Sequence, residues 1–358
     1  MKPANPIRVL VVDDSAIVRK ILRETLDAEP DIEVVGSAPD PYVARDKIMK
    51  LKPDVLTLDL EMPRMDGLTF LKKLMHYTPL PVIVISSIGQ ASCEAAMEAL
   101  RRGAVEVLAK PAGPFSVGDL RLTLAMKVRA AAKARISRPA GTPAPPAPAA
   151  PPPPGPLPEA RFHPAAVIAM GASTGGTEAL ETVIRALPKQ MPGIVVVQHI
   201  PAGFSRAFAN RLNQLCELEV KEAENGDAAV PGRVLIAPGD YHMLLRKQGD
   251  GYRVSVKTGP RVCYQRPSVD VLFQSVAQTA GPHAVGVILT GMGADGAKGM
   301  LQMKQAGAWN LAQDEATCVV YGMPREAVRA GGVDKSLPLH RIPAALLARF
   351  AEPRRKAG

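Results

Sequence analysis

At Ala165-Ala-Val-Ile-Ala-Met-Gly-Ala-Ser-Thr-Gly-Gly-Thr-Glu-Ala-Leu180 a short apolar run gives way to a glycine-rich turn and then to helix-forming residues. The run Val167–Met170 predicts a buried strand, and helix-forming residues resume at Thr177. Between them lies a G-x-S-x-G pattern, in which glycines let the chain turn sharply and expose the serine hydroxyl above the strand end. The pattern predicts that Ser173 is a nucleophile. Glycine-rich loops that open a helix also cradle phosphates, and many are plain turns, so these two alternatives stay open at this point.

The overall composition is that of a chain with real hydrophobic cores. Its 358 residues suffice for two domains, and 47% apolar with only 4% aromatic residues suits α/β sheets packed with Val, Ile and Leu. No apolar run approaches the length of a membrane span, and residues 1–6 lack the apolar segment of a signal peptide. We therefore expect a soluble, cytoplasmic protein without membrane insertion. The cysteines have no C-x-x-C spacing and are expected to be small buried apolar residues: Cys93, Cys216, Cys263 and Cys318.

The formal net charge of +10 raises the question of a nucleic-acid partner. Much of the excess lies between Lys127 and Arg138, which runs into a proline-rich segment, and in Arg354–Lys356 at the tail. Cations in segments that we expect to be flexible say little about a binding face. The second half shows no helix-turn-helix or other recognition motif, so we expect no nucleic-acid partner.

The first third of the chain, residues 7–128, alternates apolar runs with amphipathic segments five times. Such alternation predicts a doubly wound, flavodoxin-like parallel sheet whose functional residues gather at the carboxyl ends of the strands. The expected strands are Ile7–Val12, Ile32–Ala38, Val55–Leu58, Val82–Ile85 and Val105–Leu108, and the expected helices are Ile17–Ala28, Pro41–Lys50, Leu68–His76, Glu94–Arg102 and Leu120–Arg135.

Chemically specific side chains follow these expected strands. Asp13 and Asp14 follow the first strand, Asp59 follows the third, Ser86 ends the fourth and Lys110 ends the fifth. Clustered carboxylates repel one another unless a cation joins them, and their oxygens suit Mg²⁺. A lysine and a hydroxyl opposite them could bind an added phosphoryl group. Five such residues at one sheet edge favour a functional site over ordinary solvated loops.

The motifs in this half point to one family. They are Val11-Val-Asp-Asp-Ser15, Leu58-Asp-Leu-Glu-Met-Pro-Arg-Met-Asp-Gly67, Ser86 and Lys110-Pro111. On these residues the half resembles, over essentially its whole length, the receiver domain of two-component response regulators.

The resemblance to receivers implies a phosphorylation switch. Asp59 would take a phosphoryl group from a histidine kinase, and Ser86 and Lys110 would sense the phosphoryl oxygens. The resemblance assigns Mg²⁺ to Asp13, Asp14, Asp59 and the backbone carbonyl of Glu61. Val107 stands where many receivers carry an aromatic switch residue, which puts an aromatic relay in doubt but not phosphorylation itself.

The middle of the chain predicts a linker. From Pro139 to Pro158 the sequence is almost entirely proline, alanine and glycine, which cannot pack a core and favours a semi-rigid, extended spacer over a ligand for a proline-binding module. We therefore expect a receiver domain at 5–128, a Pro/Ala-rich linker at 129–163 and a catalytic domain at 164–351.

The second domain again mixes strands and helices. Ser268 has the position of an N-cap after Pro267. The region from Val220 to Lys257 has short strands with turns and is expected to include an antiparallel insertion. The expected strands are Val167–Met170, Ile194–Gln198, Val234–Ala237, His242–Leu245, Tyr252–Lys257 and Ala284–Leu289, and the expected helices are Phe204–Leu215, Val269–Thr279 and a last one that ends at Ala306.

A serine nucleophile needs a base within hydrogen-bond reach and a carboxylate that orients the base. Among six histidines, His199 is the one immediately beyond the carboxyl end of an apolar strand, beside the predicted position of Ser173. Asp295 follows another strand within a glycine-rich loop and is the expected carboxylate, with Asp314 as runner-up and Asp270 expected in the first turn of a helix. The chain order Ser, His, Asp differs from that of ordinary α/β-hydrolases. Backbone N–H groups of Thr174 and Met292 are the expected oxyanion donors.

Five stretches of the second half carry a second resemblance: Gly171-Ala-Ser-Thr-Gly-Gly176, Gln198-His-Ile-Pro201, Ile236-Ala-Pro-Gly239, Arg266-Pro-Ser-Val-Asp-Val271 and Leu289-Thr-Gly-Met-Gly-Ala-Asp-Gly296. These motifs, in the order receiver, linker, catalytic domain, resemble the chemotaxis-type protein-glutamate methylesterases. The resemblance implies a doubly wound parallel-sheet catalytic core, hydrolysis of glutamate methyl esters on chemoreceptors with release of methanol, and deamidation of selected receptor glutamines. Ser173, His199 and Asp295 carry over as nucleophile, general base and orienting partner.

We expect Ser173 Oγ to attack the ester carbonyl while His199 takes its proton, without a metal or organic cofactor for catalysis. The phosphoacceptor domain further suggests that the receiver blocks the catalytic cleft until Asp59 is phosphorylated. A nucleotide-binding reading of Gly171–Gly176 is disfavoured, because the loop lacks the lysine of a Walker loop and the G-x-G-x-x-G spacing.

Overall fold

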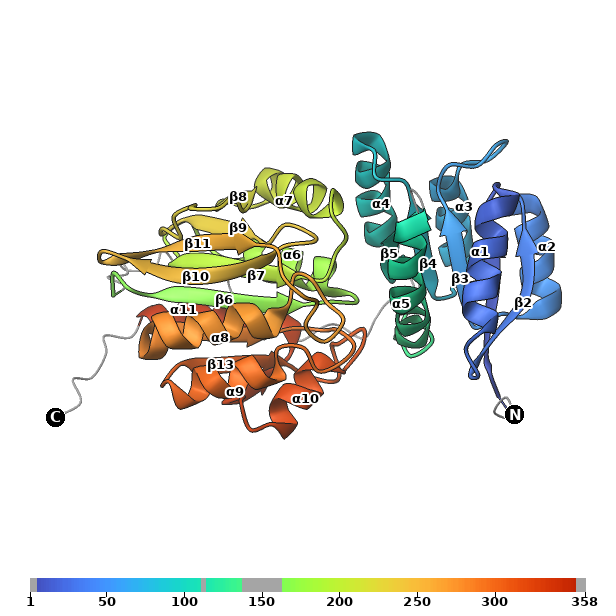
Figure 1. The fold of residues 1–358 in the computed structure, drawn as a ribbon. Helices are drawn as coiled ribbons and strands as arrows, with labels where there is room; N and C mark the ends of the chain where they lie inside the picture. The colour runs from blue at the N-terminus through green and yellow to red at the C-terminus, as the bar shows by residue number, and fades with distance from the viewer. Residues whose placement is uncertain (1–4, 111–113, 137–162, 352–358) are drawn as a thin grey trace. The chain divides into compact units, whose positions relative to one another are not determined.

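The computed structural model describes residues 5–110, 114–136 and 163–351. They fall into two compact units, each built around a parallel sheet (Figure 1). The predicted spacer Pro139–Pro158, Pro111 of the receiver motif, and the basic residues Arg354–Lys356 lie outside the described residues. Among the helices of the described ranges, none combines the length and the apolar character needed to traverse a bilayer.

The first unit is a five-stranded sheet in the order β2-β1-β3-β4-β5, which is the doubly wound arrangement that the alternating pattern predicts. Helix α1 contacts α5, and α3 contacts α4, so that helices cover both faces of the sheet. The elements are β1 (Ile7–Val12), α1 (Ala16–Asp27), β2 (Ile32–Ala38), α2 (Pro41–Leu51), β3 (Val55–Asp59), α3 (Gly67–Tyr77), β4 (Val82–Ser86), α4 (Gln90–Arg101), β5 (Glu106–Ala109) and α5 (Pro114–Ala131).

Side-chain caps start three of these helices. Ser15 accepts from the backbone N–H of Val18, Asp40 caps α2, which has Pro41 in its first turn, and Asp66 accepts from Thr69. A short polar side chain that bonds the free N–H groups of a first helical turn stabilises the helix by about 1 kcal/mol. The caps therefore fix where each of these helices begins.

Several boundaries in this unit differ from expectation. Asp59 is the last residue of β3 rather than the residue after it, and α4 begins at Gln90 rather than Glu94. Helix α5 runs from Pro114 to Ala131 instead of from Leu120 to Arg135, so the expected domain boundary at residue 128 falls within it.

The second unit is a seven-stranded sheet, in the order β14-β13-β12-β6-β7-β9-β8, with a separate hairpin β10-β11. Every strand pair of the large sheet is parallel. The strands are β6 (Val167–Ala172), β7 (Gly193–Gln198), β8 (Glu219–Glu222), β9 (Arg233–Ile236), β10 (His242–Gln248), β11 (Gly251–Lys257), β12 (Ala284–Ile288), β13 (Trp309–Gln313) and β14 (Lys335–Leu337). The helices are α6 (Gly176–Arg185), α7 (Phe204–Leu215), α8 (Val269–Thr279), α9 (Ala297–Gln305), α10 (Met323–Arg329) and α11 (Ile342–Ala351), with short 3₁₀ turns at Gly281–His283 and Leu339–Arg341.

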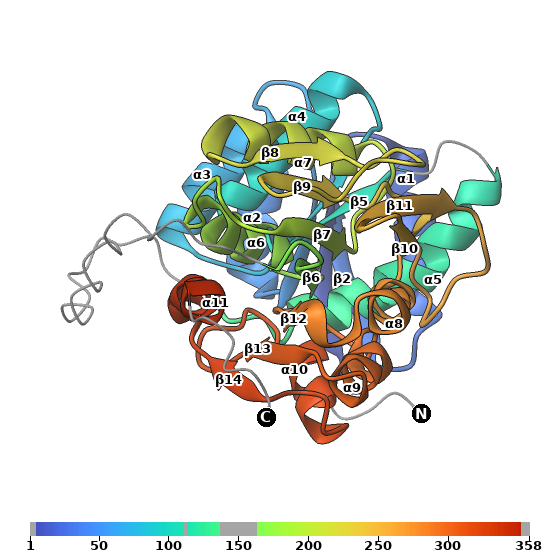
Figure 2. The same cartoon turned by 90° about the vertical axis from the view of Figure 1, so that its left-hand side faces the viewer.

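Helices lie on both sides of this sheet. Figure 2 shows α6 and α11 on one side and α8, α9 and the β10-β11 hairpin on the other. A continuous apolar core joins the sheet to α8 and α9, through residues such as Val195, Phe273 and Met300. The central strands β6, β7 and β12 are buried along their whole length, which is why they are continuous apolar runs rather than alternating ones.

The expectation of an antiparallel insertion is half right. Strands β10 and β11 form an antiparallel hairpin, but β8 and β9 join the main sheet in parallel register. Both of these strands are only four residues long. Their direction is set by the pairing of β9 with β7, since β8 pairs only with β9 in this sheet.

Candidate functional site

The nucleophile candidate and the base candidate follow neighbouring strands of the second sheet. Ala172 at the end of β6 is in register with Gln198 at the end of β7, and the His199 N–H donates to the Ala172 carbonyl across 3.1 Å. Ser173 and His199 are therefore the first residues beyond two adjacent strands. Both are almost fully buried, at 4% exposure each.

Contacts from three segments hold the backbone of Ser173. Its N–H donates to the Thr290 carbonyl across 3.0 Å, and its own carbonyl accepts from Gln198 Nε2 at 2.8 Å and from the Gly176 N–H at 2.6 Å. At Gly291 a Cβ would lie 2.7 Å from Ser173 Cβ, so only glycine permits this approach. The nucleophile loop is thereby fixed between β7 and the loop after β12.

A left-handed glycine makes the sharp turn from β6 into α6. Gly175 has φ 74° and precedes the first helical residue, and a Cβ on it would lie 2.6 Å from Val319 Cβ. The turn brings the N-terminus of α6, with its partial positive charge, close to Ser173. This is the strand-turn-helix context that the G-x-S-x-G pattern predicts.

The predicted base and the predicted carboxylate are in direct contact. His199 Nε2 lies 2.7 Å from Asp295 Oδ2, and both side chains are buried. These residues are far apart in sequence, and the fold brings them together at the carboxyl edge of β7 and β12.

Asp295 is held by three further donors, all from the start of α8. Its Oδ1 accepts from Ser268 Oγ at 2.7 Å and from the Asp270 N–H at 3.0 Å, and its Oδ2 accepts from the Val269 N–H at 2.7 Å. Burial raises the pKa of Asp295, but the hydrogen bond and the charge of His199, together with the bonds from Asp270 and Ser268, bring it below its usual range. The carboxylate is therefore ionised and fixed in orientation.

The ionised carboxylate decides which nitrogen of His199 carries the proton. Nε2 must donate to Asp295, which leaves Nδ1 with the lone pair. Nδ1 is buried and has no hydrogen-bond partner, and Ser173 Oγ makes no hydrogen bond within the described ranges. The geometry thus contains an unengaged imidazole nitrogen and an unengaged hydroxyl at one edge, without a bond between them.

The predicted oxyanion donors lie beside the site, whereas the two alternative carboxylates have other hydrogen-bond partners. Met292 is half-buried in the loop after β12, and Thr174 is buried beside Ser173 with its carbonyl bonded by Thr290 Oγ1 at 3.0 Å. Asp314, the runner-up carboxylate, caps its own loop by accepting from the Thr317 N–H and Oγ1 at 3.0 and 2.6 Å. Asp270 lies in the first turn of α8 as predicted and accepts from the Gly299 N–H at 2.8 Å.

Three supporting residues were not predicted as part of the site: Ser268, Gln198 and Thr290. Ser268 was recognised only as a helix cap, which it is, since it accepts from the Val271 N–H. No pattern in the sequence predicts the second hydrogen bond of Ser268, which it donates to Asp295. Gln198 ends an apolar strand with a buried polar side chain, and that exception could have marked it.

The cysteines are all free, but only part of the burial prediction is correct. Cys93 and Cys318 are buried, whereas Cys216 is half-buried and Cys263 is exposed. The Cys263 thiol belongs to a group with the carboxylates of Asp270 and Asp295 whose ligand atoms lie within 4.8 Å of one another. Burial, and then these two carboxylates, raise the pKa of Cys263, which keeps the thiol protonated at neutral pH.

In the first unit, the predicted acidic cluster forms around a lysine. Lys110 Nζ lies 2.7 Å from Asp59 Oδ2 and 3.3 Å from Asp13 Oδ2, and both carboxylates are buried. Burial raises the pKa of Asp59 to about 6, against the opposing effects of Lys110 and of the Glu61 N–H, which donates to Oδ1 at 3.1 Å. Burial likewise raises the pKa of Asp13, and the two carboxylates hold that of Lys110 above its usual value although burial opposes this.

The other receiver residues lie at the same edge. Ser86 ends β4 with its hydroxyl donating to the Ser92 carbonyl at 3.3 Å, and its own carbonyl accepts the Lys110 N–H at 2.8 Å. The Glu61 side chain contacts Ser87 and Ser92. Val107 is fully buried in β5.

The acidic cluster suits a hard divalent cation. Asp13, Asp14 and Asp59 each offer one oxygen, and these oxygens lie within 4.8 Å of one another. Among the described residues, the buried Oδ2 atoms of Asp13 and Asp59 have the Lys110 ammonium as their one polar contact, which leaves a lone pair on each oxygen for a cation. Carboxylate oxygens with free lone pairs are the ligands that Mg²⁺ prefers.

Two of the cations that we assigned to a flexible segment are structural. Lys127 forms a buried ion pair with Glu106 at 2.6 Å, and Arg129 pairs with Glu29 and Asp31 at 2.5 and 2.6 Å. They hold α5 against the rest of the first unit.

Comparison with known proteins agrees with both halves of the geometry. The family model of the response regulator receiver domain matches residues 9–120, and that of the CheB methylesterase matches residues 168–346. The chain is 58% identical over 336 residues to protein-glutamate methylesterase/protein-glutamine glutaminase 2 of Syntrophus aciditrophicus, covering 94% of this chain and 97% of that protein. It is 51% identical to the Salmonella choleraesuis protein-glutamate methylesterase/protein-glutamine glutaminase, over 96% of this chain and 97% of that one.

Among solved structures, the CheB methylesterase catalytic domain of Thermotoga maritima matches with a TM-score of 0.50 and 41% identity, covering 51% of this chain and 98% of that domain. This likeness, the receiver and methylesterase matches and the two parallel sheets all indicate the same family. The chain belongs to the CheB family of protein-glutamate methylesterases/protein-glutamine glutaminases with a response-regulator receiver domain.

Proposed function

We propose that this chain hydrolyses glutamate methyl esters on chemoreceptors, releasing methanol, and deamidates selected receptor glutamines, in adaptation to chemotactic signals. The observation that carries the proposal is the buried 2.7 Å contact between His199 Nε2 and Asp295 Oδ2, one strand away from Ser173. A buried carboxylate that orients an imidazole beside an unengaged serine hydroxyl is the arrangement of acyl transfer through a serine nucleophile.

In the proposed reaction Ser173 Oγ attacks the ester carbonyl and His199 Nδ1 takes the hydroxyl proton. Asp295 stabilises the imidazolium that forms, because its ionised oxygen already accepts from Nε2. The backbone N–H groups of Thr174 and Met292 are proposed to bind the oxyanion. His199 then returns the proton to the leaving group, which departs as methanol from the ester or as ammonia from the amide, and water hydrolyses the acyl-serine by the same route.

The first unit is proposed to switch this activity. Asp59 would receive the phosphoryl group from a chemotaxis histidine kinase, and Ser86 and Lys110 would contact its oxygens. Asp13, Asp14, Asp59 and the Glu61 carbonyl are proposed to hold Mg²⁺. When bound, the ion neutralises charge on the phosphoryl group. The protein would act in the cytoplasm, with the receiver at 5–128, the linker at 129–163 and the catalytic domain at 164–351.

Methanol release from methylated receptor membranes tests both halves. We expect Ser173→Ala to abolish release with or without a phosphodonor, and Asp59→Ala to keep basal release but lose its stimulation. Undiminished release by Ser173→Ala would contradict the proposal.

The receiver is proposed to block the catalytic cleft in the resting state. Deleting residues 1–140 should then raise the basal esterase rate without a phosphodonor. An unchanged or lower basal rate of the folded fragment, checked by circular dichroism, would rule out this form of regulation.

A further inference from the structure

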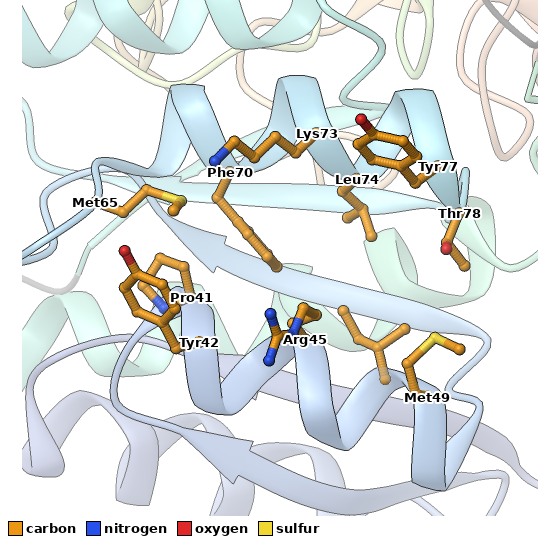
Figure 3. A pocket seen from close by; sticks show the side chains of 11 residues that line it. Pro41, Tyr42, Arg45, Met49, Met65, Phe70, Lys73, Leu74, Tyr77 and Thr78 are labelled. Atoms are coloured by element: carbon orange, nitrogen blue, oxygen red, sulfur yellow. The ribbon is translucent and has the colours of Figure 1, made fainter.

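An apolar groove in the first unit has no role in phosphorylation. It lies between α2 and α3, has a volume of about 450 Å³, and shares no lining residue with the Asp59 cluster. Figure 3 shows side chains of the two helices facing each other across it, with Phe70 and Leu74 of α3 directed toward α2. It is lined by Pro41, Tyr42, Arg45, Ile48, Met49, Met65, Phe70, Lys73, Leu74, Tyr77 and Thr78.

Three apolar side chains of this groove are exposed to solvent, whereas Ile48, Phe70 and Leu74 are buried. Tyr42, Met49 and Tyr77 are 44%, 66% and 78% exposed, and they make up three of the nine exposed large hydrophobic side chains in the described ranges. Exposed apolar residues that gather at one hollow mark an interaction site more often than isolated ones do. Met49 and Met65 can adapt their shape to a ligand because their side chains are flexible.

The charged side chains that line the groove are cations. Its lining includes the cations Arg45 and Lys73 and no carboxylate. Arg45 pairs with the adjacent Asp46 at 2.8 Å in solvent, whereas Lys73 has no ion-pair partner among the residues described. A third cation, Arg64, lies over the Tyr42 ring at 5.5 Å and pairs with Asp40. A ligand that complements this surface brings carboxylates together with its apolar groups.

The shape fits a helix better than a compact small molecule. Each wall is a helix of 11 residues, which is about 16 Å of length. A ligand helix laid along it can place large side chains at positions i, i+4 and i+7 into the groove, over a rise of about 10 Å. Tyr42 and Met65 lie toward one end of the groove, and Tyr77 and Met49 toward the other (Figure 3).

We propose that the groove between α2 and α3 is a docking site for an amphipathic, acidic helix of a partner protein, which inserts apolar side chains between Tyr42 and Tyr77 and pairs carboxylates with Lys73 and Arg45. The site is separate from the esterase residues and from the phosphoacceptor, so it would recruit the enzyme to a partner rather than take part in its chemistry.

The probe is a helical peptide of about 18 residues with leucine at i, i+4, i+7 and i+11 and glutamate on both flanks. A second peptide has the same leucines and lysine in place of each glutamate. Binding to the full chain is measured by fluorescence anisotropy, and the contacted residues are mapped by NMR. We expect saturable binding of the acidic peptide, with shifts confined to α2 and α3, and binding of the lysine peptide weaker by about tenfold.

Matched variants test the site. Lys73→Glu should weaken acidic-peptide binding by about fivefold, whereas Lys72→Glu, the same charge change one residue away and outside the groove, should leave it unchanged. Tyr77→Ser should abolish binding, and Ile17→Ser, an equally exposed apolar residue of α1, should not. Esterase activity should be the same in all four variants.

Three outcomes would overturn the proposal. The first is no saturable binding of the acidic peptide. The second is equal effects of Lys73→Glu and Lys72→Glu. The third is concentration-dependent dimerisation of the chain that Tyr77→Ser removes, because a second copy would then occupy the groove.

Discussion

Asp295 accepts a hydrogen bond from His199 across 2.7 Å while its other oxygen is held by Ser268 and the first turn of α8. The carboxylate thus orients the imidazole and is itself oriented by a helix N-terminus, where negative charge is favourable. This linkage leaves Nδ1 as the free nitrogen of His199, the atom that takes the hydroxyl proton in the proposed mechanism.

Replacing Asp295 by asparagine should strongly reduce the esterase activity. An amide at this position can donate to Nε2, which favours the wrong tautomer of His199, and kcat should fall by about 10³ to 10⁴. Steady-state methanol release checks this. Asp314→Asn is the control, since the side chain of Asp314 bonds Thr317 of its own loop. A larger loss from Asp314→Asn than from Asp295→Asn would contradict the assignment.

Ser268 should act as a positioning residue through Asp295. Ser268→Ala removes the hydrogen bond that caps Val271 and the hydrogen bond to Asp295 Oδ1. The free energy of unfolding should therefore fall by about 1 kcal/mol. Because the imidazole is then less well oriented, kcat should fall about tenfold with KM unchanged. Ser268→Thr should restore both quantities. If kcat stays at the parent value while stability falls, Ser268 serves only as a cap.

The turn at Gly175 can be tested by its steric surroundings. Gly175→Ala combines a φ of 74° with a Cβ 2.6 Å from Val319, whereas Gly226→Ala has a φ of 91° and nothing within 4 Å. The first should lower the free energy of unfolding by about 3 kcal/mol and the second by about 1 kcal/mol. Urea unfolding, followed on the transition of the second unit, measures the difference. Equal losses in the free energy of unfolding would show that the Val319 side chain moves aside and that the predicted steric clash is absent.

Magnesium binding should depend on pH through Asp59. Its pKa of about 6 means that the carboxyl is mostly protonated at pH 5 and mostly ionised at pH 7, and only the ionised form binds the cation well. Mg²⁺ affinity by calorimetry should therefore rise about tenfold between pH 5 and pH 7. A group that had to gain a proton before it bound Mg²⁺ would give the opposite result, an affinity that falls as the pH rises. An affinity that is constant over this range would refute the raised pKa.

The two sheets could be predicted because long apolar runs alternate with amphipathic segments. Ile7–Val12, Ile32–Ala38 and Val269–Thr279 begin and end as expected. The errors occur where local signals are weak. Helix α4 starts earlier than predicted because Gly89 caps it without a side-chain hydrogen bond, and the parallel pairing of β8 and β9 depends on a strand distant in sequence.

The contact between His199 and Asp295 was predictable from their positions after apolar strands, since carboxyl ends of parallel strands meet at one edge. The hydrogen bond from Ser268 to Asp295 was not, because it depends on how α8 packs against the loop after β12. The exposure of Cys263 was missed for a similar reason. Cys263 and Tyr264 adopt positive φ values of 49° and 64° in a turn whose position nothing in the local sequence specifies.

The most direct test of the account is the rate at which a serine-directed phosphonyl fluoride labels the full chain, with the site identified by peptide mass spectrometry. We expect a single label on Ser173, with labelling slowed by about 10²-fold or more in His199→Ala and unchanged in His340→Ala. Labelling at another residue, or an unchanged rate in His199→Ala, would contradict the convergence of Ser173, His199 and Asp295 in one catalytic site.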